Sequence, residues 1–205
     1  MKLYYWPGTC GITIHILLEE LGLRYDRETV DLSAKHQYSR AYLAINPKGK
    51  VPALVRDDGS VLTEVPAIAM WLASVWPAGR LLPDDVEGRT RAFELLSYIA
   101  ATTHMQGAAR AWRPLLFSAS PDEQEAVVAR GREIVMQGMD IFSQTLGRSD
   151  WLLGDYSAAD ASLFFIEYWA VEKVHYTLPP NIDAHYRRMR ARPAVQRALA
   201  AEGLT

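Results

Sequence analysis

Cys10 is the only cysteine among 205 residues, and it follows an apolar stretch, Leu3–Trp6, where a helical pattern begins near Gly11. Unpaired N–H groups in the first turn of a helix, together with the helix dipole, favour a negative charge. A thiol at that place is expected to be more acidic than a free cysteine. Free cysteines are also among the most buried residues and often act as small apolar side chains. From its position alone, Cys10 is either an activated thiol or a packing residue.

The composition limits the classes of protein to consider. A hydrophobic content of 49% is enough for a packed core without disulfides, and a single cysteine excludes both an internal disulfide and a CxxC pair. The Cys and His residues do not group into a metal site, so no metal is predicted. With 22 basic and 24 acidic residues, the formal charge of −2 gives no general attraction for nucleic acid or for an anionic membrane. The early proline and the lack of an 18-residue apolar run predict a cytoplasmic protein.

The first 76 residues alternate strand patterns with helical ones. Strands are predicted at residues 2–6 and 28–32, and the helix between them, 11–21, makes the two strands parallel. Asp57-Asp58-Gly59 lies between the apolar runs 51–55 and 61–63, which predicts an antiparallel hairpin. Pro66 suits the first turn of a helix that continues to residue 75.

The remainder of the chain is predicted to be helical after a linker rich in proline, glycine and acidic residues. Apolar residues at helical spacing predict helices at 90–111, 121–146, 157–174, 182–190 and 193–201. Ser157 and Asp160 have the spacing of a reciprocal N-terminal cap. We therefore predict an α+β protein with an α/β domain at 1–77 that contains a mixed four-stranded sheet, a linker at 78–88 and an all-helical domain at 89–205.

Several segments resemble those of one protein family. A cysteine in the first strand-to-helix loop of such an α/β domain resembles the thioredoxin-like fold. Asn46–Leu54, Leu62-Thr63-Glu64 and Gly154–Ala161 are similar to segments of the cytosolic glutathione transferases. Pro7-Gly8-Thr9-Cys10 and Ser97–His104 resemble the bacterial beta class in particular, and the similarity extends to Glu202-Gly203-Leu204.

The resemblance implies an enzyme that transfers glutathione, its co-substrate, to small hydrophobic electrophiles. It implies Cys10 and His104 as catalytic residues, a cis bond between Val51 and Pro52, and a homodimer without nucleic-acid or membrane partners. Lys35 would reach the glycine carboxylate of glutathione, and Glu64 would bind its ammonium group. The full set implied to bind glutathione is Thr9, Cys10, Lys35, Lys50, Val51, Pro52, Glu64, Val65, Thr102 and Thr103. The electrophile pocket, which the helical domain would form, is expected to include Trp6, Met105, Ala108 and Trp112.

Three departures from the family pattern leave the substrate open. Val65 stands where the family usually has serine or glycine, the segment 105–113 is several residues longer than in the beta class, and Trp6 is unusually bulky. A glutathione-dependent disulfide reductase, a dehalogenase-like enzyme and a non-catalytic protein that binds hydrophobic ligands or scaffolds a partner are the alternatives. If Cys10 forms a mixed disulfide with glutathione, a second thiol must come from outside the chain, because the chain has no other cysteine.

Overall fold

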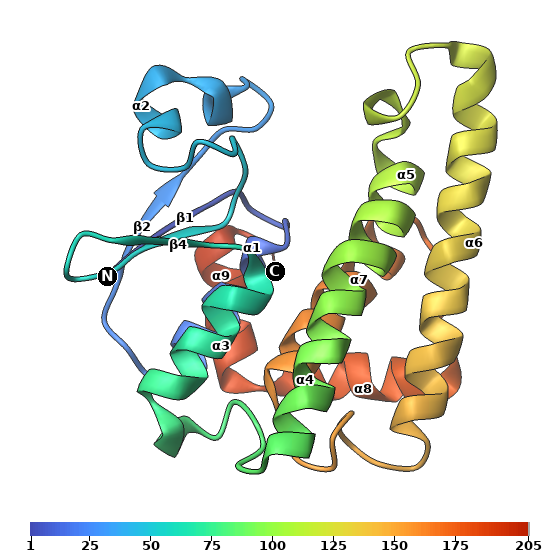
Figure 1. Ribbon diagram of the computed structural model, residues 1–205. Helices are drawn as coiled ribbons and strands as arrows, with labels where there is room; N and C mark the ends of the chain where they lie inside the picture. The colour runs from blue at the N-terminus through green and yellow to red at the C-terminus, as the bar shows by residue number, and fades with distance from the viewer. Residues whose placement is uncertain (205) are drawn as a thin grey trace. The chain divides into compact units, whose positions relative to one another are not determined.

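The computed structural model describes residues 1–204 and divides into two compact units (Figure 1). The first unit comprises Met1–Leu82 together with the segment that begins at Arg190, and the second comprises Pro83–Met189. Within the described residues, no helix is long and apolar enough to cross a membrane.

The first unit is built on a mixed sheet of four strands. These are β1 (Lys2–Tyr5), β2 (Asp26–Thr29), β3 (Ala53–Val55) and β4 (Val61–Thr63), in the order β2-β1-β3-β4. β1 and β2 are parallel, whereas β1 with β3 and β3 with β4 are antiparallel. The predicted α/β domain with a mixed four-stranded sheet is therefore confirmed. β2 begins two residues before the predicted strand at 28–32. The prediction followed the apolar Val30 and Leu32, whereas the residues that pair with β1 are the polar Asp26–Thr29.

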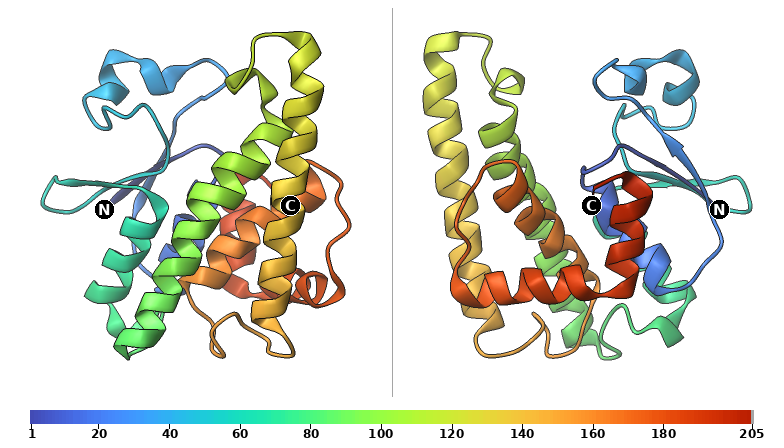
Figure 2. Two further views of the ribbon diagram at one scale, coloured as in Figure 1. Left: turned by 45° about the vertical axis from the view of Figure 1, so that its right-hand side comes forward. Right: turned by 180° about the vertical axis from the view of Figure 1, so that it is seen from behind.

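Helices cover both faces of this sheet. α1 (Gly11–Glu20), α3 (Val65–Val75) and α9 (Pro193–Glu202) lie on one face, and α2 (Arg40–Leu43) lies on the other (Figures 1 and 2). The first eight residues of α1 are all buried, since the helix lies between the sheet and its two neighbours. Toward α2, a smaller core contains Tyr4, Val30, Tyr42 and Ala53. Short 3₁₀ turns at His36–Tyr38 and Pro77–Gly79 connect the elements.

α9 joins the first unit, whereas the sequence placed all of 89–205 in one helical domain. Two ion pairs tie the end of the chain to α1: Arg192 binds Glu20 with 2.7 Å between Nε and Oε1, and Arg197 binds Glu19 with 2.7 Å between Nε and Oε2. The compact units thus do not follow the predicted boundary, because α9 is helical but packs on the α/β core. Thr205, the end of the predicted domain, lies outside the described residues.

The second unit is helical throughout. It contains α4 (Val86–Tyr98), α5 (Ala109–Trp112), α6 (Pro121–Leu146), α7 (Ala158–Glu172) and most of α8 (Pro180–Ala191). α6 has the predicted bounds. The region predicted as one α-helix at 90–111 contains a π-helical segment, Ile99–Ala108, between α4 and α5. A further 3₁₀ turn lies at Pro114–Leu116.

α7 is the central helix of the second unit. Its first thirteen residues are buried, and most of them are apolar. It begins at the predicted cap, in which the Ser157 backbone N–H donates to Asp160 Oδ2 at 2.8 Å and Ser157 Oγ accepts from Ala159 N at 3.3 Å. The other oxygen, Asp160 Oδ1, accepts the backbone N–H of Leu152 at 2.9 Å.

Candidate active site

Cys10 is the N-cap residue of α1, and its thiol faces the backbone that precedes β3. Cys10 Sγ donates to the carbonyl oxygen of Val51 at 3.6 Å. The loop before it is a tight turn, because the backbone N–H and the Oγ1 hydroxyl of Thr9 both donate to the Trp6 carbonyl, at 3.2 and 2.7 Å. Strand β1, this turn and α1 therefore hold the thiol against Val51.

The electrostatics of Cys10 contradict the expected acidification. Burial raises the pKa of the Cys10 thiol to about 12. A backbone hydrogen bond and the charge of Lys50 act in the opposite direction but are too weak to offset burial, and the charges of Glu64 and Glu202 raise the pKa further. The thiol also uses its proton as a donor to Val51, an arrangement that the thiolate could not keep. At neutral pH Cys10 therefore carries an S–H group.

The segment around Val51 is held in place by buried polar side chains. The Val51–Pro52 peptide bond is cis, as the resemblance implied. The preceding carbonyl, that of Lys50, accepts Tyr42 Oη at 2.7 Å and Asn46 Nδ2 at 2.6 Å. Both side chains are almost fully buried, so they fix the backbone that the Cys10 thiol contacts.

Glu64 occupies an uncommon backbone conformation directly before α3. Its φ of 71° is rare for a residue with a side chain, and such residues gather at ligand sites. Lys48 Nζ donates to Glu64 Oε1 and to Thr63 Oγ1, each at 2.8 Å. Lys48 was not among the predicted site residues, although it lies in the segment Asn46–Leu54 whose similarity to the family was recognised.

A second residue that sequence reasoning missed is Glu202, near the end of α9. Its side chain is fully buried and accepts the backbone N–H of Gly8 at 2.8 Å through Oε2. Its other oxygen contacts His15 Nδ1 of α1 at 3.0 Å. One carboxylate thus connects the turn before Cys10 with α1 and α9. The only sequence signal was the similarity of Glu202-Gly203-Leu204 to the family, which carries no hint of a partner.

Comparisons with known proteins agree with this geometry. Residues 9–75 match the family described as the N-terminal domain of glutathione S-transferase. The glutathione S-transferase GstA of Escherichia coli O157:H7 is 38% identical over 208 residues, covering 100% of both chains. The chain belongs to the glutathione S-transferase family. Among solved structures, a glutathione transferase homologue from Sulfitobacter with bound glutathione has a TM-score of 0.88 and 31% identity, covering 100% of this chain and 98% of that one. The beta-class glutathione S-transferase of Sphingomonas chungbukensis has a TM-score of 0.82 and 32% identity, covering 100% of both.

In the first unit of this transferase, Cys10 interacts with three other predicted residues. Cys10 contacts Val51 directly, and the charges of Lys50 and Glu64 shift its pKa in opposite directions. Of the other predicted residues, Pro52 and Val65 are buried, and Thr9 and Trp6 are half-buried in the turn. Lys35 is exposed with a left-handed φ of 59°, and no described contact joins it to Cys10, Val51 or Glu64.

The predicted residues of the second unit fall into two groups. The His104 ring packs edge-on against Phe165 and Trp169 of α7, with ring centroids 4.8 and 5.6 Å apart. Thr102 and Met105 are half-buried, and Trp112 is 47% exposed. In contrast, Thr103 and Ala108 are buried within the second unit, so their side chains are not available to a ligand in this structure.

Proposed function

We propose that this transferase conjugates the thiol of glutathione to small hydrophobic electrophiles and that the first unit binds the peptide. The observation that carries this proposal is the contact between Cys10 Sγ and the Val51 carbonyl, at 3.6 Å, next to the Glu64 carboxylate. A cysteine-containing peptide that pairs with the Val51 backbone would bring its sulfur to Cys10. The electrophile is left unnamed, because the segment 105–113 departs from the family pattern.

The ends of glutathione have the charges that the start of α3 can bind. The γ-glutamyl end carries a carboxylate and an ammonium group. The N–H groups of the first turn of α3, which includes Val65, favour the carboxylate, and Glu64 favours the ammonium. Because Val65 has no hydroxyl group, only backbone N–H groups bind the γ-glutamyl carboxylate in this proposal.

Lys48 Nζ pairs with the Glu64 carboxylate. Both side chains are more than half exposed, and exposed ion pairs of this kind contribute only about 0–1 kcal/mol. Displacing Lys48 by the ammonium group of glutathione therefore costs little. In the proposal, Lys48 positions the Glu64 carboxylate, and the ammonium group of glutathione then replaces Lys48 as its partner.

The role that we propose for Cys10 is that of a hydrogen-bond donor to the sulfur of glutathione. A protonated thiol can turn from the Val51 carbonyl toward a bound thiolate and stabilise its charge, and that stabilisation lowers the pKa of the peptide thiol. A mixed disulfide would instead require a Cys10 thiolate and an oxidised partner. The raised pKa of Cys10 favours the donor role. The resemblance assigns His104 a part in the same activation.

Titration of glutathione into a Glu64→Gln variant tests the binding proposal. The amide retains the size of the side chain but removes the charge that attracts the ammonium group, so binding should weaken by about tenfold or more. Glu125→Gln, an exposed change on α6, is the matched control and should bind as the parent does. Equal affinity of the two variants would contradict the site, and a parent chain that fails to bind glutathione would contradict the function.

Two substitutions of Cys10 separate the possible roles of the thiol. Cys10→Ser keeps a donor and should retain most conjugation activity, whereas Cys10→Ala should raise the pKa of bound glutathione, measured by thiolate absorbance. If thiol–disulfide exchange is the main activity, both variants lose it equally. His104→Gln, assayed in the same way, tests the assignment of His104.

The finer assignments that remain are the assembly and location of the enzyme. We propose a homodimer in the cytoplasm, without nucleic-acid or membrane partners, on the strength of the family and of the near-neutral charge. Light scattering of the purified chain distinguishes a dimer from a monomer, and cell fractionation tests the location.

A further inference from the structure

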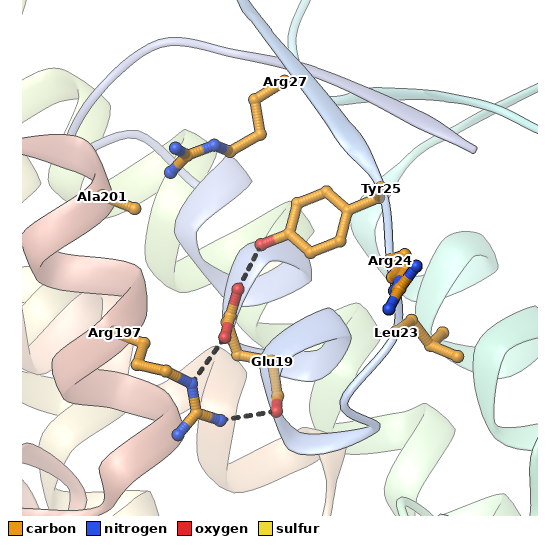
Figure 3. A pocket seen from close by; sticks show the side chains of 7 residues that line it. All are labelled: Glu19, Leu23, Arg24, Tyr25, Arg27, Arg197 and Ala201. Atoms are coloured by element: carbon orange, nitrogen blue, oxygen red, sulfur yellow. Dashed lines mark hydrogen bonds and ion pairs between the residues drawn. The ribbon is translucent and has the colours of Figure 1, made fainter.

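A shallow pocket of about 420 Å³ lies in the first unit, and none of the proposed glutathione ligands lines it. α1 contributes Glu19, and α9 contributes Arg197 and Ala201 (Figure 3). The turn after α1 and strand β2 contribute Leu23, Arg24, Tyr25 and Arg27. The pocket therefore combines three guanidinium groups with one carboxylate and a small apolar surface.

The single carboxylate of the pocket is already neutralised. Arg197 Nε donates to Glu19 Oε2 at 2.7 Å, and Arg197 Nη2 donates to the Glu19 carbonyl at 2.8 Å. Tyr25 Oη donates to Glu19 Oε1 at 2.7 Å (Figure 3). Partial burial opposes the ionisation of Glu19, but the bonds from Tyr25 and Arg197 outweigh it and lower the pKa of this carboxyl. Glu19 thus stays ionised and fully engaged.

Arg24 and Arg27 supply positive charge that nothing in the pocket balances. Neither guanidinium group has a hydrogen bond or a carboxylate partner within residues 1–204, and both residues are exposed. Arg27 stands opposite Leu3 in the register of β1 and β2, so it lies on the sheet face that α1, α3 and α9 cover. There its guanidinium extends toward Ala201 of α9 (Figure 3). The pocket carries two positive charges in excess.

We propose that this pocket binds a small organic molecule that carries at least two negative charges. Guanidinium groups bind carboxylate and phosphate oxygens through paired hydrogen bonds. Arg27 and Arg24 lie on opposite sides of Tyr25 in Figure 3, and both line the pocket together with Leu23 and Ala201, which offer apolar contacts to a carbon skeleton. A charge on an edge strand also discourages pairing with other chains. Protection of the sheet edge would explain Arg27 alone, whereas the anion site also explains Arg24.

Inorganic pyrophosphate is a suitable probe, and calorimetry in the presence of saturating glutathione keeps it out of the thiol site. The parent chain should bind one equivalent saturably, and affinity should fall as salt is added. The double variant Arg24→Gln/Arg27→Gln should bind about ten to a hundred times more weakly, because it loses two charge-assisted contacts.

The matched control is the double variant Arg132→Gln/Arg148→Gln, which also removes two positive charges, from exposed arginines of α6 and of the turn after it that have no ion pair within residues 1–204. It should leave pyrophosphate affinity unchanged, and all variants should keep the glutathione affinity of the parent, which shows that they are folded. No saturable binding to the parent at about 1 mM pyrophosphate would overturn the proposal. Equal loss in the double variant and the control would do the same, because it would reduce the effect to net charge.

Discussion

Burial of Cys10 and the hydrogen bond that its thiol donates to the Val51 carbonyl both favour the neutral thiol, and together they outweigh the backbone hydrogen bond that favours the thiolate. The start of α1 offers a dipole that favours a thiolate, yet the side chain turns to the Val51 carbonyl and forms no cap with the backbone N–H groups. A dipole worth about 0.3–1 kcal/mol cannot offset the desolvation of an anion. The physical reason for the wrong expectation is that the sequence showed the helix start but not the depth of the thiol.

The reactivity of this thiol toward iodoacetamide should therefore depend steeply on pH. Only the thiolate reacts, and with the pKa of Cys10 raised to about 12 its fraction is small at pH 7 and grows about tenfold for each pH unit. The rate should keep rising past pH 9, whereas that of free glutathione levels off near its ordinary thiol pKa. The Cys10→Ala variant gives the background, because the chain has no other cysteine. A plateau below pH 9 would show an activated thiolate instead.

Glu202 is a second residue whose effect can be measured alone. Glu202→Ala removes the carboxylate that accepts the buried Gly8 N–H and contacts the buried His15 ring. Loss of a buried hydrogen-bond partner costs about 1–3 kcal/mol, so urea unfolding should show a loss of about 3 kcal/mol for the two contacts. Glu202→Gln keeps an acceptor for Gly8 and should lose less. If the alanine variant is as stable as the parent, the carboxylate does not hold the turn before Cys10.

At the scale of elements, local signals located most helices but not their irregularities. α6 starts at Pro121 and ends at Leu146, as predicted, because apolar periodicity, a proline in its first turn and a following glycine all agree. The π-helical segment Ile99–Ala108 was missed, since its residues continue the helical pattern of α4. The difference lies in hydrogen-bond spacing, which packing against α6 and α7 decides and which composition does not report.

Gly131 shows how tightly α6 packs against α5. A Cβ atom built there would lie 2.5 Å from the Ala111 backbone nitrogen and 2.8 Å from the Gly107 carbonyl oxygen. Neither backbone atom can move aside as a flexible side chain can. Gly131→Ala should therefore destabilise the protein by about 1–3 kcal/mol, although alanine is intrinsically the better helix former by about 1 kcal/mol.

Chemical denaturation measures this effect, and Ala129→Gly provides the control. Ala129 is exposed on the same helix, so its change to glycine should cost about the intrinsic 1 kcal/mol. A stabilised Gly131→Ala protein would mean that α5 and α6 can separate without loss, against the close approach that the structure shows.

At the scale of the whole molecule, contacts between distant parts of the sequence were the hardest to predict. The predicted domain boundary separated α9 from α1, yet Arg197 binds Glu19 and Glu202 binds His15 across more than 170 residues. Helical periodicity shows that α9 has an apolar face but not which surface receives it. The family resemblance predicted Cys10, Val51 and Glu64 as site residues because their motifs are local, whereas Lys48 and Glu202 attract attention only through their partners in the structure.

The overall stability should fall as pH rises because of a buried cluster in the second unit. His185 lies between two carboxylates, with Nδ1 2.7 Å from Glu167 Oε1 and Nε2 3.2 Å from Asp160 Oδ1, and all three side chains are fully buried. Burial alone would lower the pKa of His185, but the charge of Glu167 and the hydrogen bonds to both carboxylates outweigh it and raise the pKa to about 9. Burial raises the pKa of Glu167, and the His185 charge opposes this only in part.

The sign of the pH effect follows from the two states of His185. Its pKa is 6.5 in the unfolded chain and about 9 in the folded protein, so the folded state holds an extra proton between these values. The stabilisation is complete below pH 6.5 and is lost as pH rises to about 9, a decrease of about 3 kcal/mol in the free energy of unfolding. Urea titrations at pH 6 and pH 10 measure it, and His185→Gln should be less stable at pH 6 and nearly independent of pH over this range. Should that variant not fold, an NMR titration of the His185 ring in the parent gives the same answer. A midpoint near 6.5 would show that the two carboxylates do not hold its proton.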